Sequence, residues 1–183
     1  MRTIIVLFAL TCGLFLILRF AITPKYGEDV ESRFIERIRY IPSQKPELLT
    51  QSNLAKWLAD PRNGDAISGY VFPVLFPFDI LFLVCLGLLL GFASVALAGT
   101  MDFLSSVPHW VWWLFPAVYM ASDLSEDTVV AAIFKSFVPL SSGSFSLLST
   151  LTAIKLTTIG IAIGQVGFLT ALLALLRLFP TPR

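Results

Sequence analysis

The sequence predicts an all-α integral membrane protein with about four transmembrane helices and an amphipathic helical insert between the first and the second. Of the 183 residues, 56% are hydrophobic and 14% are charged, about half the charged share of an average soluble domain. The charges are also uneven, because 15 of the 25 lie between Arg19 and Asp65. This composition and the net charge of +1 exclude a soluble globular enzyme, a disordered chain and a nucleic-acid-binding protein that works by bulk charge.

The first element is residues 1–22. Arg2 is followed by an apolar run over residues 3–18, slightly shorter than the roughly 20 residues that a transmembrane helix needs. A retained signal-anchor helix and a removed signal peptide both begin in this way. Because no small-x-small cleavage site follows the run, the sequence favours a signal-anchor helix.

Residues 23–68 form a polar insert in which we expect two short amphipathic helices. Apolar residues recur at helical spacing at Val30, Phe34, Ile38 and Ile41. With acids in its first turn and bases in its last turn, this pattern predicts a helix over 28–41. A second helix is expected over 52–59, with Ser52 as its N-cap. Two short helices cannot bury a core alone, so their apolar sides are expected on the membrane surface or on the loops of the spanning helices.

Residues 69–183 are expected to form a bundle of three further transmembrane helices, at about 70–98, 107–122 and 147–178. The last is longer than a bilayer requires, so we expect it to tilt or to begin outside the hydrocarbon. The segment 107–122 is rich in aromatic residues and runs directly into acidic residues. If that segment is re-entrant, the chain has three spans rather than four.

The orientation in the membrane rests on the basic residues. With four spans, Arg2, Arg177 and Arg183 lie on one side, and the insert with seven Lys or Arg residues lies on the other. Counting bases alone puts the insert in the cytoplasm. However, these bases alternate with seven acids, and a short basic N-terminal tail usually stays inside. We therefore favour termini on the cytoplasmic side of a plasma (inner) membrane.

Asp79 is the only charged residue within 70–98. An ionised carboxylate inside the hydrocarbon costs at least about 2.5 kcal/mol, so it is expected to face the protein interior with a partner. Pro77 removes the donor that would bond the carbonyl of Pro73, and this predicts a kink. Asp79 is then either an ion or proton site beside broken backbone, or an interfacial residue that caps a helix beginning near Pro77.

Asp123, Glu126 and Asp127 form an acidic group at offsets of three and four residues, which bring side chains to one helix face. Carboxylates this close repel one another unless they share a cation or one of them is protonated. Oxygen ligands suit Mg²⁺, Ca²⁺ or Mn²⁺ rather than zinc, so one interpretation is a divalent-metal site. The other is a solvated N-terminus of a helix that begins near Asp127.

Lys155 lies within the apolar segment 147–178. It either extends to the membrane interface or pairs with Asp79 or with the acids around Asp123. In the second case three helices share one polar intramembrane node, which includes Asp79 and Lys155. This pairing is the sharpest hypothesis that the sequence supports.

Two G-x-x-x-G motifs predict close helix packing, because small residues let backbones approach where lipid supplies no hydrophobic drive between helices. Gly87 and Gly91 lie in the second span; Gly160 and Gly164 lie in the last, where Gly167 extends the pattern. These faces predict either packing within one chain, or association with a protein partner or a second copy of the chain.

Several kinds of chemistry are excluded or unexpected. His109 is the only histidine, so a haem held by two histidines of one chain and a histidine-rich metal site are excluded. Cys12 and Cys85 lie in apolar segments without C-x-x-C spacing, so thiol–disulfide exchange is not expected. No cofactor is predicted apart from a divalent cation at the acidic group, and the expected partners are the lipid bilayer and protein, with no nucleic acid.

Three functions remain. The first is a non-catalytic accessory, scaffold or assembly component of a membrane complex, which accounts for the small-residue faces and the lack of a catalytic motif. The second is a small oligomeric ion- or proton-coupled transporter that uses Asp79 and Lys155. The third is an interfacial lipid-processing enzyme with a carboxylate metal site. The sequence favours the first and a protein that is not an enzyme.

Overall fold

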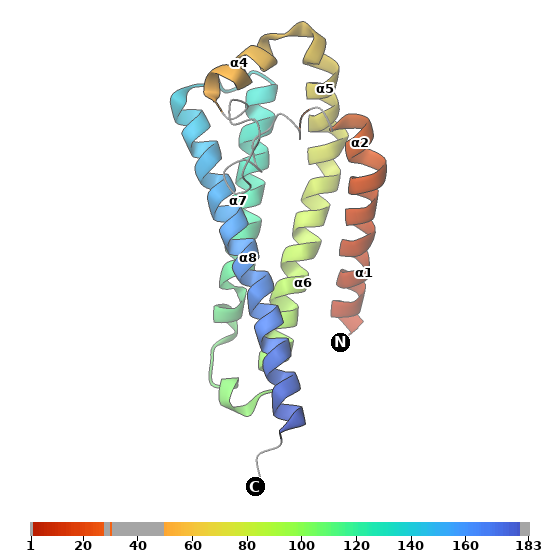
Figure 1. Cartoon of the computed structure of the whole chain (residues 1–183), viewed down its shortest axis with the longest axis vertical. Helices are drawn as coiled ribbons and strands as arrows, with labels where there is room; N and C mark the ends of the chain where they lie inside the picture. Colours follow the sequence, from red (N-terminus) through yellow and green to blue (C-terminus); the bar gives the residue numbers. More distant parts are fainter. Residues whose placement is uncertain (1, 28–29, 31–49, 180–183) are drawn as a thin grey trace.

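A computed structural model describes residues 2–27, 30 and 50–179, and every regular element in these ranges is a helix. The chain runs along the bundle four times. It passes up through α1, down through α5 and α6, up through α7 and down through α8, with α4 lying across one end (Figure 1). The beginning of α1 and the end of α8 lie towards the opposite end. The predicted all-α fold is confirmed for the described residues.

The first helical segment continues past the expected boundary at residue 22. It consists of α1 (Arg2–Ile17), a π-helical turn η1 (Leu18–Ile22) and α2 (Thr23–Tyr26). α1 packs along α6, and the segment is exposed on most of its other sides. The helix predicted over 28–41 lies outside the described residues, apart from Val30, which is buried.

The second predicted insert helix is α4 (Gln51–Ala59), and its cap differs from the predicted one. Thr50, rather than Ser52, is the N-cap, because the Thr50 Oγ1 accepts a hydrogen bond from the backbone N–H of Asn53 at 3.2 Å. A 3₁₀ turn, η4 (Pro61–Asn63), then leads into the next helical segment. α4 buries Leu54 and Trp57 against the ends of the long helices.

The second helical segment is α5 (Gly64–Gly69), η5 (Tyr70–Asp79) and α6 (Ile80–Ala98). Its backbone leaves helical geometry at Phe72 (φ −142°, ψ 115°) and at Phe76 (φ −116°, ψ 118°). Each of these residues precedes a proline, whose ring disfavours helical geometry in the residue before it. The predicted kink is therefore present, and Asp79 lies just beyond it, at the last position before the regular helix α6.

The third segment differs from its prediction. After a short turn η6 (Asp102–Leu104), a single helix α7 (His109–Phe134) continues through residues 123–127, where the sequence predicted a helix end near 122. The acids do not stop the helix, because Asp and Glu cost it only tenths of a kcal/mol and their side chains are turned into the bundle.

The last segment is α8 (Ser142–Leu178), which begins earlier than the predicted residue 147. Ser141 and Ser144 form a reciprocal capping box, in which each side chain accepts a hydrogen bond from the backbone N–H of the other. The serine-rich stretch is therefore the start of this helix rather than a loop before it.

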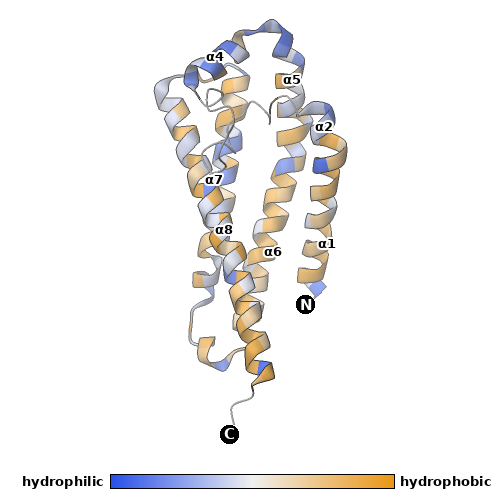
Figure 2. Cartoon of the chain, viewed as in Figure 1, coloured by the Kyte–Doolittle hydropathy of each residue, from blue (hydrophilic) through white to orange (hydrophobic). Residues whose placement is uncertain are grey.

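Three segments are long and apolar enough to span a membrane: Arg2–Tyr26, Pro61–Ala98 and Ser142–Leu178. α7 is not among them; it contains Asp123, Glu126 and Asp127, and Figure 2 shows hydrophilic residues on α7 in the middle of the bundle. The prediction of membrane-spanning helices is thus confirmed for three segments, and the count of four stays a prediction.

Candidate functional site

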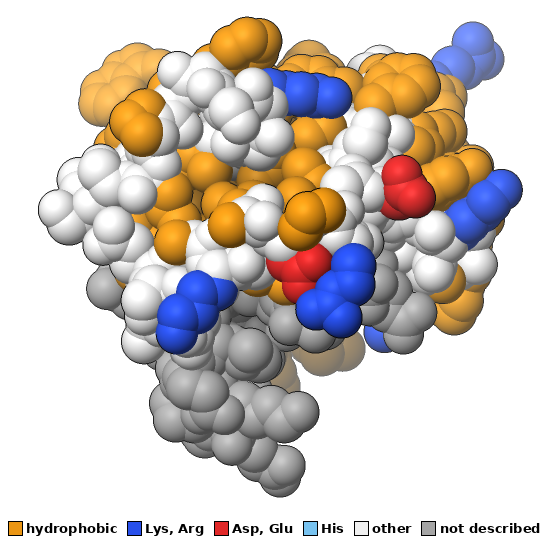
Figure 3. Space-filling model, turned by 90° about the horizontal axis from the view of Figure 1, so that it is seen from above, with side chains coloured by type: hydrophobic (Ala, Val, Ile, Leu, Met, Phe, Trp, Pro, Cys, Tyr) orange, Lys and Arg blue, Asp and Glu red, His pale blue; other side chains and the backbone are white. Residues whose placement is uncertain are grey.

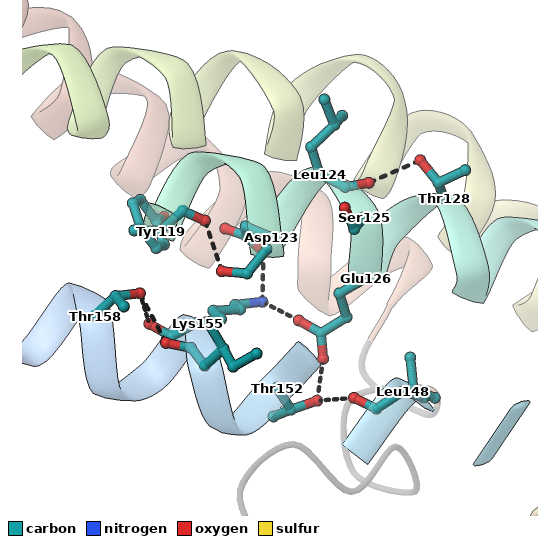
Figure 4. A network of polar contacts seen from close by, with 12 residues as sticks. Tyr119, Asp123, Leu124, Ser125, Glu126, Thr128, Leu148, Thr152, Lys155 and Thr158 are labelled. Atoms are coloured by element: carbon teal, nitrogen blue, oxygen red, sulfur yellow. Dashed lines mark hydrogen bonds and ion pairs between the residues drawn. The ribbon is translucent and has the colours of Figure 1, made fainter. Parts of the chain in front are cut away.

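Lys155 lies at the centre of a buried ionic network between α7 and α8 (Figure 4). Its Nζ is 2.6 Å from the Oδ1 of Asp123 and 2.8 Å from the Oε2 of Glu126. Asp123 is 3% exposed and Glu126 is completely buried. The lysine predicted to join a polar node therefore contacts two of the three acids in the predicted acidic group.

The sequence of α7 explains why its acids point inwards. Tyr119, Asp123, Glu126, Asp127 and Val130 are buried and recur at offsets of three and four residues, which mark one side of a helix. The residues between them include Leu124 and Thr128, which are exposed. The acidic group thus occupies the packed side of an amphipathic helix whose outer side is uncharged.

Asp79 joins this network from the second helical segment. One carboxylate oxygen from each of Asp79, Asp123 and Asp127 can be chosen so that all three lie within 4.8 Å of one another. We call the set Asp79, Asp123, Glu126, Asp127 and Lys155 the polar node. It connects three helical segments, as the pairing hypothesis required.

The composition of the carboxylate cluster differs from the predicted metal set. The sequence grouped Asp123, Glu126 and Asp127, whereas the clustered oxygens belong to Asp79, Asp123 and Asp127. Glu126 instead faces α8, where its carboxylate contacts both Lys155 and the hydroxyl of Thr152. Successive residues on a helix differ by 100° in direction, so Glu126 and Asp127 meet different neighbours.

The charge of the node defines its chemistry. It contains four carboxyl groups and one ammonium group, so Lys155 cannot neutralise all of them when they are ionised. Carboxylates within 4.8 Å disfavour each other's charged form, and a bound proton or a cation relieves this repulsion. Three carboxylate oxygens from separate residues are ligands that Mg²⁺ or Ca²⁺ accepts. The arrangement can therefore bind a proton or a hard cation.

Thr152 is a member of the network that the sequence did not single out. Its hydroxyl lies against Glu126 and also 3.0 Å from the carbonyl oxygen of Leu148, its own i−4 position. The available signal was its spacing, because Thr152 is three residues before Lys155 and so lies on the same side of α8.

Gln165 forms a second polar contact, deeper in the bundle. Its Nε2 donates to the Ser94 Oγ on α6 at 2.8 Å and to the Trp112 carbonyl oxygen on α7 at 3.0 Å. Pro116 stands four residues after Trp112 and has no N–H, so the helix cannot bond that carbonyl in the usual way. Gln165 supplies the missing donor and connects three helices.

The two glycine motifs have different surroundings. A Cβ added at Gly87 would overlap the side chain of Met120, and one added at Gly91 would overlap the ring of Trp113. The α6 motif is therefore filled by side chains of α7. In contrast, a Cβ added at any glycine of the α8 motif (Gly160, Gly164 and Gly167) meets nothing within 4 Å.

Comparison of the chain with protein-family models, with curated proteins and with solved structures gives no match.

Proposed function

We propose that the chain is a non-catalytic scaffold or accessory component of a membrane assembly, and that it associates with a second copy of itself through the outer side of α8. The observation that carries the proposal is the open α8 motif. Gly160, Gly164 and Gly167 are exposed, and Ala171 and Ala174 continue the same exposed stripe.

The stripe extends over nearly the whole of α8 with a spacing of seven residues. Between Gly143 and Ala174, every position in two adjacent heptad rows is Gly, Ala, Ser or Thr: Gly143, Thr150, Thr157, Gly164 and Ala171 in one row, and Ser146, Ala153, Gly160, Gly167 and Ala174 in the other. A strict seven-residue repeat keeps one seam facing a partner helix over many turns. In lipid, small residues at such a seam allow the close approach from which helix association gains its van der Waals energy.

A ridge of large apolar residues borders this groove at the same spacing. The ridge consists of Leu147, Ile154, Ile161, Phe168 and Leu175, which are between 39% and 67% exposed. A groove of small residues beside a ridge of large ones is self-complementary, because the ridge of one copy can lie in the groove of a twofold-related copy. This favours a second copy of the chain over an unrelated partner.

The test compares the same substitution on two helices. Ala171→Leu combined with Ala174→Leu fills the groove, whereas Ala121→Leu makes one change of the same kind at an exposed position of α7. Two differently tagged copies are co-expressed, extracted in a mild detergent and purified through one tag. We expect the unmodified chain and Ala121→Leu to recover the second copy, and the groove variant to lose it.

If the unmodified chain never recovers its differently tagged copy, self-association through α8 is wrong. Identification of the proteins that are recovered then tests the wider proposal. An unrelated membrane protein that is lost with the groove variant would keep the accessory function with a different partner. Recovery of the single chain alone would contradict the scaffold function.

A second candidate function is supported by the polar node. Its carboxylate cluster would suit a proton- or cation-coupled transporter, because Asp79 lies beside a kinked helix and its carboxylate is close to those of Asp123 and Asp127. Asp79→Asn should abolish proton or cation flux into liposomes while the protein still folds. Asp102→Asn, an exposed acid outside the node, is the matched control. Absence of flux with the unmodified chain would contradict this candidate.

The lipid-processing alternative is less well supported, because the acids it would use are buried among helices. Asp123 and Asp127 are 3% and 2% exposed, so a lipid headgroup could reach them only if the bundle opened.

For the membrane and the orientation, we propose a plasma (inner) membrane with both termini in the cytoplasm. The basic residue at the start of α1 supports this orientation.

A further inference from the structure

In the described helices, two levels of charged residues bound a section of the bundle that is apolar. On α1, Arg2 and the exposed Arg19 have no charged residue between them, and their separation is about 25 Å along an α-helix. α6 begins directly after Asp79 and contains no charged residue over its 19 residues, or about 28 Å. On α8, the interval between Lys155 and Arg177 is also uncharged, over about 33 Å.

The upper charged residues lie at one common level. The rings of Phe15 and Phe82 are 6.4 Å apart. Arg19 is one turn beyond Phe15, and Asp79 is about one turn before Phe82, on the same side of this contact because α1 and α6 run in opposite directions. Lys155 belongs to this level as well, through the polar node. Arg19, the node and the end of η1 therefore mark a single plane across the bundle.

The lower level carries the signals of a membrane interface. Arg2, Asp102 and Arg177 lie at this end of their helices, and η6 follows the end of α6. Trp110 is 66% exposed in the first turn of α7. Tryptophan is enriched where hydrocarbon meets the headgroups. The apolar section between the two levels has roughly the thickness of a bilayer hydrocarbon core, about 30 Å.

The bundle on the far side of the node has a hydrophobic core of its own. The larger buried cluster lies on the α4 side of the node and includes two residues of α4 itself. Its members are Val30, Leu54, Trp57, Tyr70, Val71, Val74, Leu75, Val130, Ile133, Phe134 and Leu148. Collecting apolar side chains in an interior is favourable in water, whereas lipid provides no such drive. Lys, Arg, Asp and Glu side chains are spread over this end of the molecule (Figure 3). Most of the exposed large hydrophobic side chains lie in the apolar section, along α1 and α8, whereas fewer are exposed in the head, among them Phe72, Phe137 and Leu147.

We propose that the hydrocarbon core of the bilayer surrounds only the section between these two levels, and that the part of the bundle from the polar node to α4 projects into water as a head. On α8 the head would extend about 20 Å beyond Lys155. The polar node then lies at the membrane interface rather than at the bilayer centre, where a lysine and four carboxyl groups would cost far more. This inference does not depend on the proposed function.

The boundary can be tested with single cysteines in a chain whose own two cysteines are replaced (Cys12→Ala and Cys85→Ala). Two matched pairs use exposed positions two heptads apart on one helix: Leu147→Cys with Ile161→Cys on α8, and Thr128→Cys with Leu114→Cys on α7. Each variant is reconstituted in phosphatidylcholine–phosphatidylglycerol vesicles. A charged, water-soluble maleimide is present on both sides of the vesicle membrane.

In each pair, the head-side cysteine (Leu147→Cys or Thr128→Cys) should react about tenfold faster or more than its partner, because hydrocarbon excludes a charged reagent. After denaturation in dodecyl sulfate, all four cysteines should react at similar rates, which shows that their thiols are intact. The α7 pair lies away from the proposed association face, so a second copy does not influence its result. The boundary is wrong if Thr128→Cys reacts as slowly as Leu114→Cys, or if Leu114→Cys reacts as fast as Thr128→Cys. The same result in the α8 pair counts against the boundary only when the chain is monomeric, because Leu147 and Ile161 belong to the proposed association face.

Discussion

The inner and the outer side of α8 differ in the contacts that they make within the chain. The inner side is held by polar contacts: Lys155 pairs with Asp123 and Glu126, and Gln165 bonds α6 and α7. The outer side has small residues with open space above them, as at Gly164. In lipid, apolar contact alone gives little preference for one helix neighbour, so paired polar groups specify the fold, while the small-residue side remains for another molecule.

The glycine motif of α6 shows that a motif alone does not reveal its occupant. Gly87 and Gly91 have the same spacing as Gly160 and Gly164, yet only the first pair is covered within the chain. What differs is the neighbouring helix, because α7 presents Met120 and Trp113 to α6. Substitutions can test the difference between the two sides of α8 and between the filled and the open motif. They follow in order of decreasing expected effect on the free energy of unfolding.

The largest effect is expected on the inner side of α8, from Lys155→Met. This change leaves Asp123 and Glu126 without their cation, and removing one partner of a buried ion pair costs about 3–5 kcal/mol. The free energy of unfolding is measured by dodecyl sulfate titration in mixed micelles, followed by tryptophan fluorescence. Adding Glu126→Gln to Lys155→Met should restore part of the loss, because it removes one uncompensated charge.

An unchanged dodecyl sulfate midpoint for Lys155→Met would contradict the structural role of the polar node. Lys135→Met is the matched control, because Lys135 is exposed at the end of α7 and lies outside the node. Exposed charges contribute at most about 1 kcal/mol, so this variant should unfold close to the unmodified chain.

A smaller effect is expected from adding one methyl group to each glycine motif. Gly91→Ala brings the new Cβ into the ring of Trp113, and overpacking of this kind costs about 1–3 kcal/mol. Gly164→Ala meets nothing within 4 Å in the single chain, so the free energy of unfolding should not fall. Thermal denaturation in a detergent in which the chain is monomeric compares the two variants. Equal destabilisation would show that the outer side of α8 is packed in the folded chain.

Most of the helical architecture followed from hydrophobicity, because long apolar runs leave a chain few alternatives to helices in a membrane. The residue at which the third helix ends could not be predicted from hydrophobicity. Residues 123–127 look like a polar boundary in the sequence, but Asp79 of η5 and Lys155 of α8 lie against their acids. Their local helix propensity is not low enough to break α7. Burial of charge depends on neighbours that are distant in sequence, which one-dimensional hydropathy does not contain.

The polar node could be predicted only as a hypothesis. The rule that charges in a membrane need partners indicated that Asp79, Lys155 and the acids near Asp123 meet. The individual partners did not follow, because Glu126 and Asp127 are adjacent in sequence and diverge by 100° around the helix. Thr152 was missed because a threonine in an apolar helix usually bonds its own backbone, and only the position of α7 shows that Glu126 faces it.

The smallest effect concerns Gln165, the second polar contact on the inner side of α8. Gln165→Leu should cost about 1 kcal/mol, the typical scale of a hydrogen bond between membrane helices. The Trp112 carbonyl loses a donor that Pro116 cannot replace. If this is the reason, Pro116→Ala should reduce the cost of Gln165→Leu, because an alanine N–H can bond that carbonyl within α7. The four chains of this double-mutant cycle are compared by dodecyl sulfate titration. A cost that is the same with Pro116 and with Ala at this position would mean that Gln165 acts through Ser94 alone.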